Sequence, residues 1–248
     1  MPAITVPKLG EYRQDIVESG GLKWVIGRGT HDSLTVNHEM EPAGHSIHDY
    51  ICAQFTRGKV FLDIGAHTGH YTVRAAAKGC QVYAVEANPE AAAQLRLNLY
   101  LNRLRATVWA VAAWDIVQPL HYMIAPGSYQ MRNGSASLAS PASNSEDMGI
   151  WVMGVPLDEF LDRVDRVDVV KMDVEGADCN VIDGMTASLA RLRPLLIFES
   201  HWFTGCYSEA DMAAREAHLT DTAGYSWCDA TSLGVRSAEK FRVGTPGC

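Results

Sequence analysis

The amino-acid sequence predicts an α/β protein: a doubly wound, mostly parallel seven-stranded sheet with helices on both faces, plus an N-terminal strand–helix extension. Two observations support this fold class. From residue 59 onward, short apolar runs typical of strands alternate with stretches of helical apolar spacing, which is the pattern of parallel sheets. The segment 63–69 carries glycines between the first of these strands and the next helix, where such sheets bind their ligands.

The individual elements follow from apolar runs, helical spacing and capping residues. Strands are expected at 60–64, 81–86, 106–113, 167–174, 194–199, 225–228 and 241–243. Helices are expected at 44–55, 69–78, 178–189 and 208–220. Another helix begins after Asn88, which can cap free backbone N–H groups, and Pro89 suits its first position. The buried face of that helix is expected to comprise Ala92, Leu95 and Leu99.

The length of 248 residues suits one large domain with an appendage. Residues 1–57 are interpreted as an N-terminal strand and helix extension that caps the domain, with one or two short strands at 22–28 and 33–36. Residues 58–248 are interpreted as the domain itself. A Ser/Gly-rich insertion at 126–147, after a strand at 118–124, is expected to form a long loop. Loops of that length in a compact domain are usually functional or disordered.

Composition narrows the possible partners and compartment. The chain has 21 Lys and Arg against 29 Asp and Glu, a net charge of −8, so neither nucleic acid nor an anionic membrane is expected as a partner. The longest apolar run, 108–114, is far shorter than the roughly 20 residues of a membrane span. The six cysteines form no C-x-x-C pair, which favours free thiols and a cytoplasmic location.

The glycine-bearing segment and an acid after the second strand together predict an adenosine-containing cofactor. Gly65 lets the backbone approach a ligand closely, and the following helix offers free N–H groups. Glu86 ends the second strand about twenty residues later, where an acid can accept both ribose hydroxyls. The simpler alternative is that the glycines only form a tight strand–helix corner.

The identity of that cofactor depends on charge and on one missing glycine. Dinucleotide-binding sites carry the motif G-x-G-x-x-G, but in this chain His67 occupies the position of the second glycine. Asp63 would repel a pyrophosphate and attract the ammonium group of a methionine moiety. S-adenosylmethionine is therefore favoured over NAD.

A second group of polar residues follows two later strands. Lys171, Asp173 and Glu175 would share one face if their strand ran straight to Glu175. The next strand ends at Glu199, with His201 two residues further on. Charged groups that close apolar strands are costly unless they are paired or functional. They either form a catalytic rim or a structural ion-pair network.

These motifs resemble the FkbM-type S-adenosylmethionine-dependent methyltransferases, class I enzymes with a Rossmann-like fold. The resemblance covers about residues 59–199 and rests on four segments, which are 61–69, 85–89, 170–178 and 197–199. The K-x-D-x-E-G element at 171–176 is its most specific part. The chain departs from the family where His67 replaces a frequent asparagine and Asp178 replaces a frequent glutamate.

The resemblance implies roles for individual residues around the cofactor. Those that would hold its methionine end are Asp63, Gly65 and Gly69. Those that would line its approach are Ala66, His67, Thr68 and Tyr71. Glu86 with Ala87 would bind ribose, and Ala112 with Ala113 would flank adenine. Asp173 would face the reacting methyl group.

The resemblance also implies methyl transfer to a hydroxyl of a small-molecule, sugar or secondary-metabolite acceptor, with S-adenosylhomocysteine as the product. A general base helps such a transfer, and the candidates are Asp173, Glu175, Glu199 and His201. Lys171 is expected to orient a carboxylate. A divalent metal on the carboxylates is conceivable, but no spacing demands one. The alternatives are an NAD-dependent oxidoreductase and a non-catalytic adenosyl-binding module.

Overall fold

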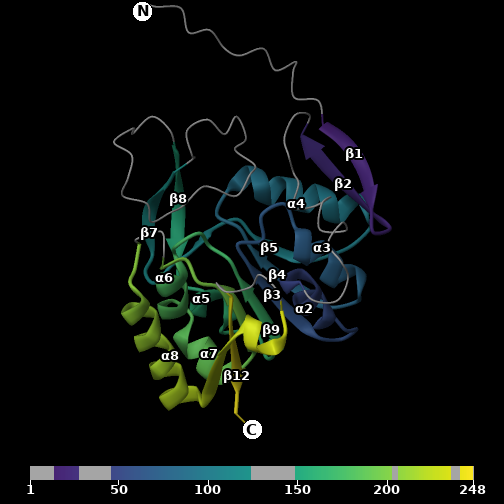
Figure 1. The fold of residues 1–248 in the computed structure, drawn as a ribbon. Helices are drawn as coiled ribbons and strands as arrows, with labels where there is room; N and C mark the ends of the chain where they lie inside the picture. The colour runs from purple at the N-terminus through teal and green to yellow at the C-terminus, as the bar shows by residue number, and fades with distance from the viewer. Residues whose placement is uncertain (1–13, 28–45, 124–148, 203–205, 236–240, 248) are drawn as a thin grey trace, which may run out of the picture.

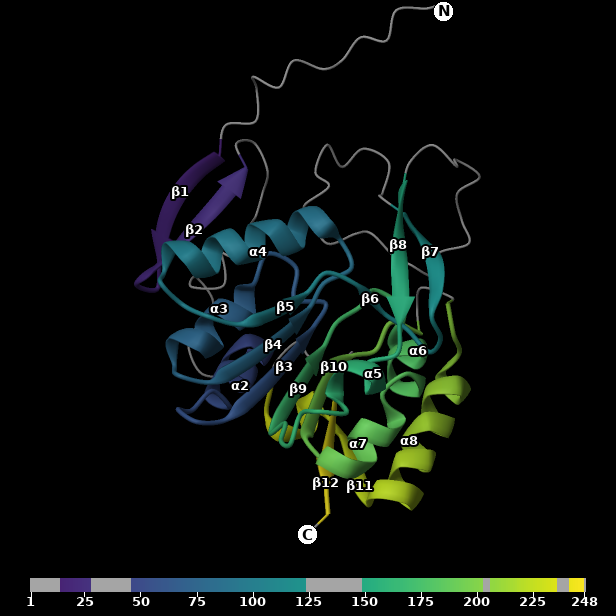
Figure 2. The same cartoon turned by 180° about the vertical axis from the view of Figure 1, so that it is seen from behind.

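A seven-stranded sheet forms the centre of the protein (Figures 1 and 2). The computed structural model describes residues 14–27, 46–123, 149–202, 206–235 and 241–247. The strands of the central sheet are β3 (Val60–Ile64), β4 (Gln81–Val85), β5 (Thr107–Trp109), β9 (Val169–Met172), β10 (Leu195–Glu199), β11 (Tyr225–Asp229) and β12 (Phe241–Pro246). Their order is β11-β12-β10-β9-β3-β4-β5, and only β12 runs against its neighbours. The predicted mostly parallel sheet is confirmed.

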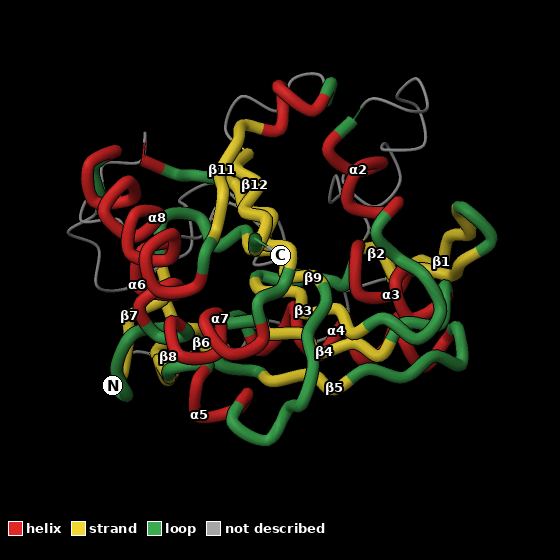
Figure 3. The backbone as a smooth tube through the Cα atoms, turned by 90° about the horizontal axis from the view of Figure 1, so that it is seen from below, coloured by secondary structure: helices red, strands yellow, loops and turns green. Residues whose placement is uncertain are grey.

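Helices cover both faces of this sheet, as predicted. One face packs against α5 (Asp158–Leu161), α6 (Asp178–Asp183), α7 (Thr186–Leu192) and α8 (Glu209–Ala223). The other packs against α2 (Ile47–Ala53), α3 (His70–Ala77) and α4 (Pro89–Leu101). Figure 3 shows α6 and α8 lying well apart from α2 and α3. Alternation along the strands explains the two layers, because Phe61 faces the second group while Leu62 faces the first.

The start of α4 follows the predicted capping pattern. Asn88 accepts a hydrogen bond from the backbone N–H of Glu90 at 2.9 Å, and Pro89 occupies the first helical turn. The predicted apolar face is buried, because Leu95 is fully buried and Leu99 nearly so. This cap fixes the direction in which the chain leaves β4.

An N-terminal hairpin packs on α4. It consists of β1 (Gln14–Ser19), which the sequence analysis missed, and β2 (Leu22–Gly27), which it predicted. Asn98 accepts from the backbone N–H of Val25 at 2.8 Å, and Trp24 is fully buried in the same layer. The expected strand at 33–36 lies outside the described residues.

The expected third strand, 106–113, is wrong as a single element. The chain leaves the central sheet after β5, and β6 (Ala112–Ala113) pairs instead with β8 (Gly149–Val155). β8 also pairs with β7 (Gln118–Met123), the strand predicted at 118–124, in a separate three-stranded sheet. Periodicity could not reveal the switch because both pieces are apolar. The loop predicted at 126–147 lies outside the described residues.

The helix expected at 178–189 is divided into α6 and α7 at Gly184. A Cβ atom at this position would lie 1.9 Å from the carbonyl oxygen of Trp114, so the two backbone segments are in contact. The carbonyl of Gly184 also accepts a hydrogen bond from the N–H of Asp158 at 3.0 Å. These long-range contacts override the local helical spacing.

Two further expectations concern the whole chain. Five cysteines lie in the described ranges, and all five are free thiols. Among the described helices, none is both long enough and apolar enough to cross a bilayer.

Candidate active site

One cavity of about 330 Å³ opens at the carboxyl ends of β3, β4, β9 and β10, within the ~300–1,000 Å³ range of small-molecule sites. Its wall includes the glycine-bearing loop, the end of β4 and the polar ends of β9 and β10. The lining residues are Ile47, Ile64, Gly65, Ala66, His67, Thr68, His70, Tyr71, Val85, Glu86, Ala87, Val111, Ala113, Tyr122, Lys171, Asp173, Val174, Glu175, Glu199 and Phe241. The two predicted groups of functional residues therefore meet in one cavity.

The loop after β3 is formed by close backbone packing. Gly65 has a φ of +73°, and a Cβ atom there would lie 1.8 Å from the carbonyl oxygen of Asp173. His67 has a φ of +50°, a region that histidine and asparagine enter more readily than most residues. This backbone conformation accounts for the histidine–asparagine exchange by which the chain departs from the family.

Glu86 is buried at the end of β4 and lines the cavity. One carboxylate oxygen accepts from the N–H of His67 at 2.7 Å, and the other accepts from the N–H of Asn88 at 2.8 Å. Burial raises the pKa of Glu86, although His67 and the two backbone hydrogen bonds act in the opposite direction. The carboxylate thus ties the glycine loop to the start of α4 and keeps lone pairs for a ligand.

Lys171 links the glycine loop to two carboxylates beside the cavity. Its ammonium group donates to the carbonyl oxygen of Gly65 at 3.0 Å and lies 3.5 Å from Asp63 and 3.8 Å from Asp173. Burial acts to lower the pKa of Lys171, but Asp63 and Asp173 outweigh it and the pKa lies above its usual range. The side chain is therefore charged, which agrees with an orienting role.

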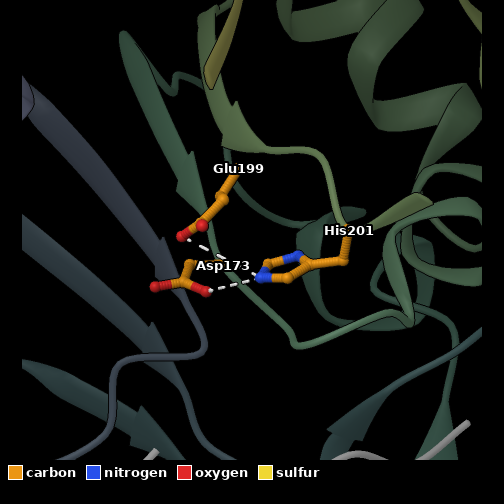
Figure 4. Close-up of side chains that lie close together, drawn as sticks. All are labelled: Asp173, Glu199 and His201. Carbon is orange, nitrogen blue, oxygen red and sulfur yellow. Dashed lines mark ion pairs between the residues drawn. The ribbon is translucent and has the colours of Figure 1, made fainter. Parts of the chain in front are cut away.

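His201 lies behind the rim of the cavity, surrounded by carboxylates. Its Nε2 atom is 3.7 Å from Asp173, 3.7 Å from Glu175 and 3.9 Å from Glu199. Its Nδ1 atom is 3.3 Å from the buried carboxylate of Asp178. Burial lowers the pKa of His201, but hydrogen bonding to Asp178 and the surrounding acids raise it to about 9. Figure 4 shows Asp173 and Glu199 converging on the same imidazole nitrogen.

Glu175 reaches the cavity by a turn and not by strand alternation. β9 ends at Met172, and Glu175 has a φ of +53°, so the expected straight strand to Glu175 is wrong. Lys171, Asp173 and Glu175 nevertheless line the same cavity. Burial, and next the charge of Asp173, raise the pKa of Glu175 to about 7.

Most residues predicted to contact the cofactor line the cavity. Those that do are Gly65, Ala66, His67, Thr68, Tyr71, Glu86, Ala87, Ala113 and Asp173. Asp63, Gly69 and Ala112 are not among its lining residues, so their predicted cofactor contact stays a prediction. Asp63 is fully buried and accepts from the Thr72 hydroxyl at 2.7 Å, because its side chain points toward α3. Gly69 caps α3 against Leu95, and Ala112 is fully buried.

The predicted catalytic residues divide in the same way. Lys171, Asp173, Glu175 and Glu199 line the cavity, whereas His201 does not. Sequence reasoning missed several lining residues, which come from outside the two motifs: Ile47, His70, Val111, Tyr122 and Phe241. Tyr122 lies on a strand that was predicted, but nothing local indicates that β7 folds back beside the cavity.

The fold and the cavity define a class of protein: a Rossmann-like α/β protein with a glycine loop, a buried acid at the end of the next strand and an acidic rim. The family model of the methyltransferase FkbM domain matches residues 63–222, more than half of the chain. The chain therefore belongs to the FkbM methyltransferase family.

Individual relatives are more distant. A solved methyltransferase FkbM from Methylobacillus flagellatus is 13% identical, with a TM-score of 0.49 over 77% of this chain and 44% of that chain. The T. thermophilus 16S rRNA N2 guanine methyltransferase, solved with AdoMet and guanosine, is 15% identical, with a TM-score of 0.51 over 96% of this chain and 51% of that chain. The tRNA (guanine(37)-N(1))-methyltransferase of Leishmania braziliensis is 38% identical over 68 residues, 27% of this chain and 10% of that protein. The chain thus spans about half or less of the relatives' lengths.

These relatives correct one expectation. The sequence analysis excluded nucleic acid as a partner, yet two of the three relatives are named as methyltransferases of tRNA or rRNA. The exclusion was wrong because a net charge of −8 is a sum over the whole chain. Contact with RNA depends on the local field at the contact surface, which that sum does not describe.

Proposed function

We propose that the chain is an S-adenosylmethionine-dependent O-methyltransferase that acts on a hydroxyl of an oxygen-rich acceptor, such as a sugar or secondary metabolite. One observation carries the proposal: a single cavity is lined by the glycine loop and Glu86 at one end and by Asp173, Glu175 and Glu199 at the other. Family membership and the FkbM-type motifs support the same reading. An NAD-dependent oxidoreductase and a non-catalytic adenosyl-binding module are less well supported by this combination.

The cofactor end of the cavity fits an adenosine-containing group. Glu86 can accept from ribose hydroxyls while it keeps its two backbone hydrogen bonds. Gly65 has no Cβ, which allows the glycine loop to pack directly against the backbone of Asp173 and so joins the two ends of the cavity. When bound, S-adenosylmethionine supplies an activated methyl group on a sulfonium, and the local excess of carboxylates suits that positive charge.

The acceptor end can align a hydroxyl and remove its proton. Asp173, Glu175 and Glu199 line the cavity, so a carboxylate of this rim is the proposed general base. Lys171 contacts Gly65, Asp63 and Asp173, and its proposed role is to position the loop and Asp173. Most of the rate gain in such a transfer comes from alignment of the two reactants.

A nucleotide of RNA is the second candidate acceptor. The tRNA methyltransferase of Leishmania braziliensis, 38% identical over 68 residues, is the observation that favours it. The cavity can admit only part of a polynucleotide, so an RNA would present one nucleotide to the rim.

Two broader expectations remain part of this proposal. The extension at residues 1–57 would act as a cap, which is supported by Ile47 of α2 lining the cavity. A cytoplasmic location is supported by the five free thiols in the described ranges.

The proposal is tested by incubating the protein with methyl-labelled S-adenosylmethionine and two acceptor pools, hydroxylated small molecules and total RNA. Mass spectrometry of the labelled product then identifies the methylated atom. Label on an oxygen supports O-methyl transfer, and the labelled pool distinguishes the two acceptor classes. Label on nitrogen or carbon would overturn the O-methyl assignment.

Variants on the acceptor rim supply the matched comparison. Glu175→Gln should retain S-adenosylmethionine binding and lose at least about 100-fold in turnover, the low end of what a general base contributes. Glu209→Gln, the same change on the exposed start of α8, should retain full turnover. Full activity in both Glu175→Gln and Asp173→Asn would show that neither carboxylate acts as the general base.

A further inference from the structure

The cluster behind the acceptor rim combines one imidazole with two carboxylates, at the carboxyl ends of two neighbouring strands. Asp173 follows β9, Glu199 ends β10 and His201 lies two residues beyond it. One ligand-type atom from each of the three lies within 4.8 Å of the other two. Figure 4 shows both carboxylates directed at the same side of the His201 ring. Such mixed nitrogen and oxygen donor sets are typical of divalent metal sites.

The distances in this cluster suit a cation better than direct hydrogen bonds. The Nε2 atom of His201 lies 3.7 Å from Asp173 and 3.9 Å from Glu199, beyond the usual ~2.7–3.2 Å of a hydrogen bond. Metal–ligand bonds of about 2.0–2.2 Å place neighbouring ligand atoms roughly 3–3.6 Å apart. A shift of a few tenths of an ångström would bring Nε2 of His201 to that separation from either carboxylate, and the ligand atoms of Asp173 and Glu199 lie within 4.8 Å of each other.

Two independent features of the cluster are typical of a metal site. The Nδ1 atom of His201 lies 3.3 Å from Asp178, which is fully buried and so fixes the ring with Nε2 toward the rim. A carboxylate on the far nitrogen is the usual outer partner of a metal-binding histidine. In addition, Oδ1 of Asp173, the oxygen nearest Nε2, is buried and has no hydrogen-bond partner within the described residues.

We propose that Asp173, Glu199 and His201 form a binding site for one divalent cation that accepts both carboxylate and imidazole ligands, with Asp178 as the positioning residue for His201. Glu175, 3.7 Å from the same nitrogen, lies outside this ligand set and is the rim carboxylate that would accept the acceptor's proton. The role of the ion rests on the proposed methyl transfer. Because Asp173 and Glu199 line the cavity, the ion would hold an oxygen of the acceptor and lower its pKa, so that the proton leaves to a rim carboxylate.

The site is tested by titrating the metal-free protein with Mn²⁺ alone and following binding by calorimetry and by the electron paramagnetic resonance of free Mn²⁺. The titration is run at about pH 9, because the pKa of His201 is about 9 and protons compete with metals for these ligands. The expected result is saturable binding of one ion per chain. Glu199→Gln and His201→Gln should each weaken it at least about tenfold, and Asp178→Asn about 10–100-fold.

Matched variants separate the site from general charge effects. Glu209→Gln and His218→Gln make the same changes at exposed positions of α8 and should leave Mn²⁺ affinity unchanged. Circular dichroism and thermal unfolding check that each variant is folded. If His201→Gln does not fold because its residue is buried, Glu199→Gln at the rim keeps the test decisive.

Titration of the same samples with S-adenosylmethionine separates this proposal from the proposed function. Mn²⁺ binding that is absent from the wild type, or equal in Glu199→Gln and Glu209→Gln, would show a structural ion-pair network and overturn the metal site. If the wild type binds Mn²⁺ but does not bind S-adenosylmethionine, the cofactor assignment is overturned and the metal site is not.

Discussion

The two ends of the cavity are built on different principles. At the cofactor end, one carboxylate, Glu86, is anchored by two backbone N–H groups and the loop is shaped by close backbone contact. At the acceptor end, Asp173, Glu175 and Glu199 gather around His201 at 3.7–3.9 Å. Short, anchored contacts make a site of fixed shape, whereas a loosely spaced set of charges makes a site whose energy depends on what binds there.

Lys171 joins the two ends, and its removal should have the largest effect. Lys171→Met leaves the fully buried Asp63 without its cation, so stability should fall by about 3–5 kcal/mol. Denaturant unfolding measures the change. Lys23→Met, which breaks an exposed ion pair with Glu18, should alter stability little. Equal losses in the two variants would show that Lys171 does not hold the site together.

Gly65 tests the close packing of the cofactor end. Gly65→Ala places a Cβ atom 1.8 Å from a backbone oxygen that cannot rotate away, so the loop must move. S-adenosylmethionine affinity should fall at least about 100-fold, or roughly 2.7 kcal/mol. Gly58→Ala is the matched control, because Gly58 also has a positive φ (+86°) but no atom within 4 Å of the new Cβ. Calorimetry should show cofactor affinity unchanged in that control.

Glu86 tests the single anchored carboxylate. Glu86→Gln removes a charged acceptor of ribose hydroxyls, and each such bond contributes roughly 1.5–3 kcal/mol. Cofactor affinity should therefore fall about 10–100-fold. Glu90→Gln, four positions later and exposed, is the control and should bind normally. Equal affinity in the two variants would remove Glu86 from the cofactor site.

His67 should give the smallest effect. His67→Asn suits the φ of +50° and keeps the backbone hydrogen bond to Glu86, so thermal stability should change little. His67→Val carries a β-branched side chain in the same conformation and should cost about 1–2 kcal/mol. A valine variant as stable as the asparagine variant would mean that the loop relaxes freely.

The sequence predicted best where local chemistry determines structure. Asn88 and Pro89 begin α4 as expected, and Gly65 and Glu86 reach the same cavity because parallel strands end at one edge of the sheet. Strand alternation, in contrast, does not explain how Glu175 reaches the cavity, because the strand ends at Met172 and the turn that follows has no periodic signal.

Long-range contacts account for most of what the sequence could not reveal. The split of the strand at 106–113 depends on pairing between Ala112 and Gly154, about forty residues away. The contribution of Tyr122 to the cavity depends on the same small sheet. Asp178 was noted only as a departure from the family, and its contact with His201 became visible only in three dimensions.

Calorimetric titration of the wild-type protein with S-adenosylmethionine, S-adenosylhomocysteine and NAD tests the central claim most directly. The structure predicts saturable binding of one S-adenosylmethionine or one S-adenosylhomocysteine per chain, and no binding of NAD. Binding of NAD without binding of S-adenosylmethionine would contradict the assignment of this cavity.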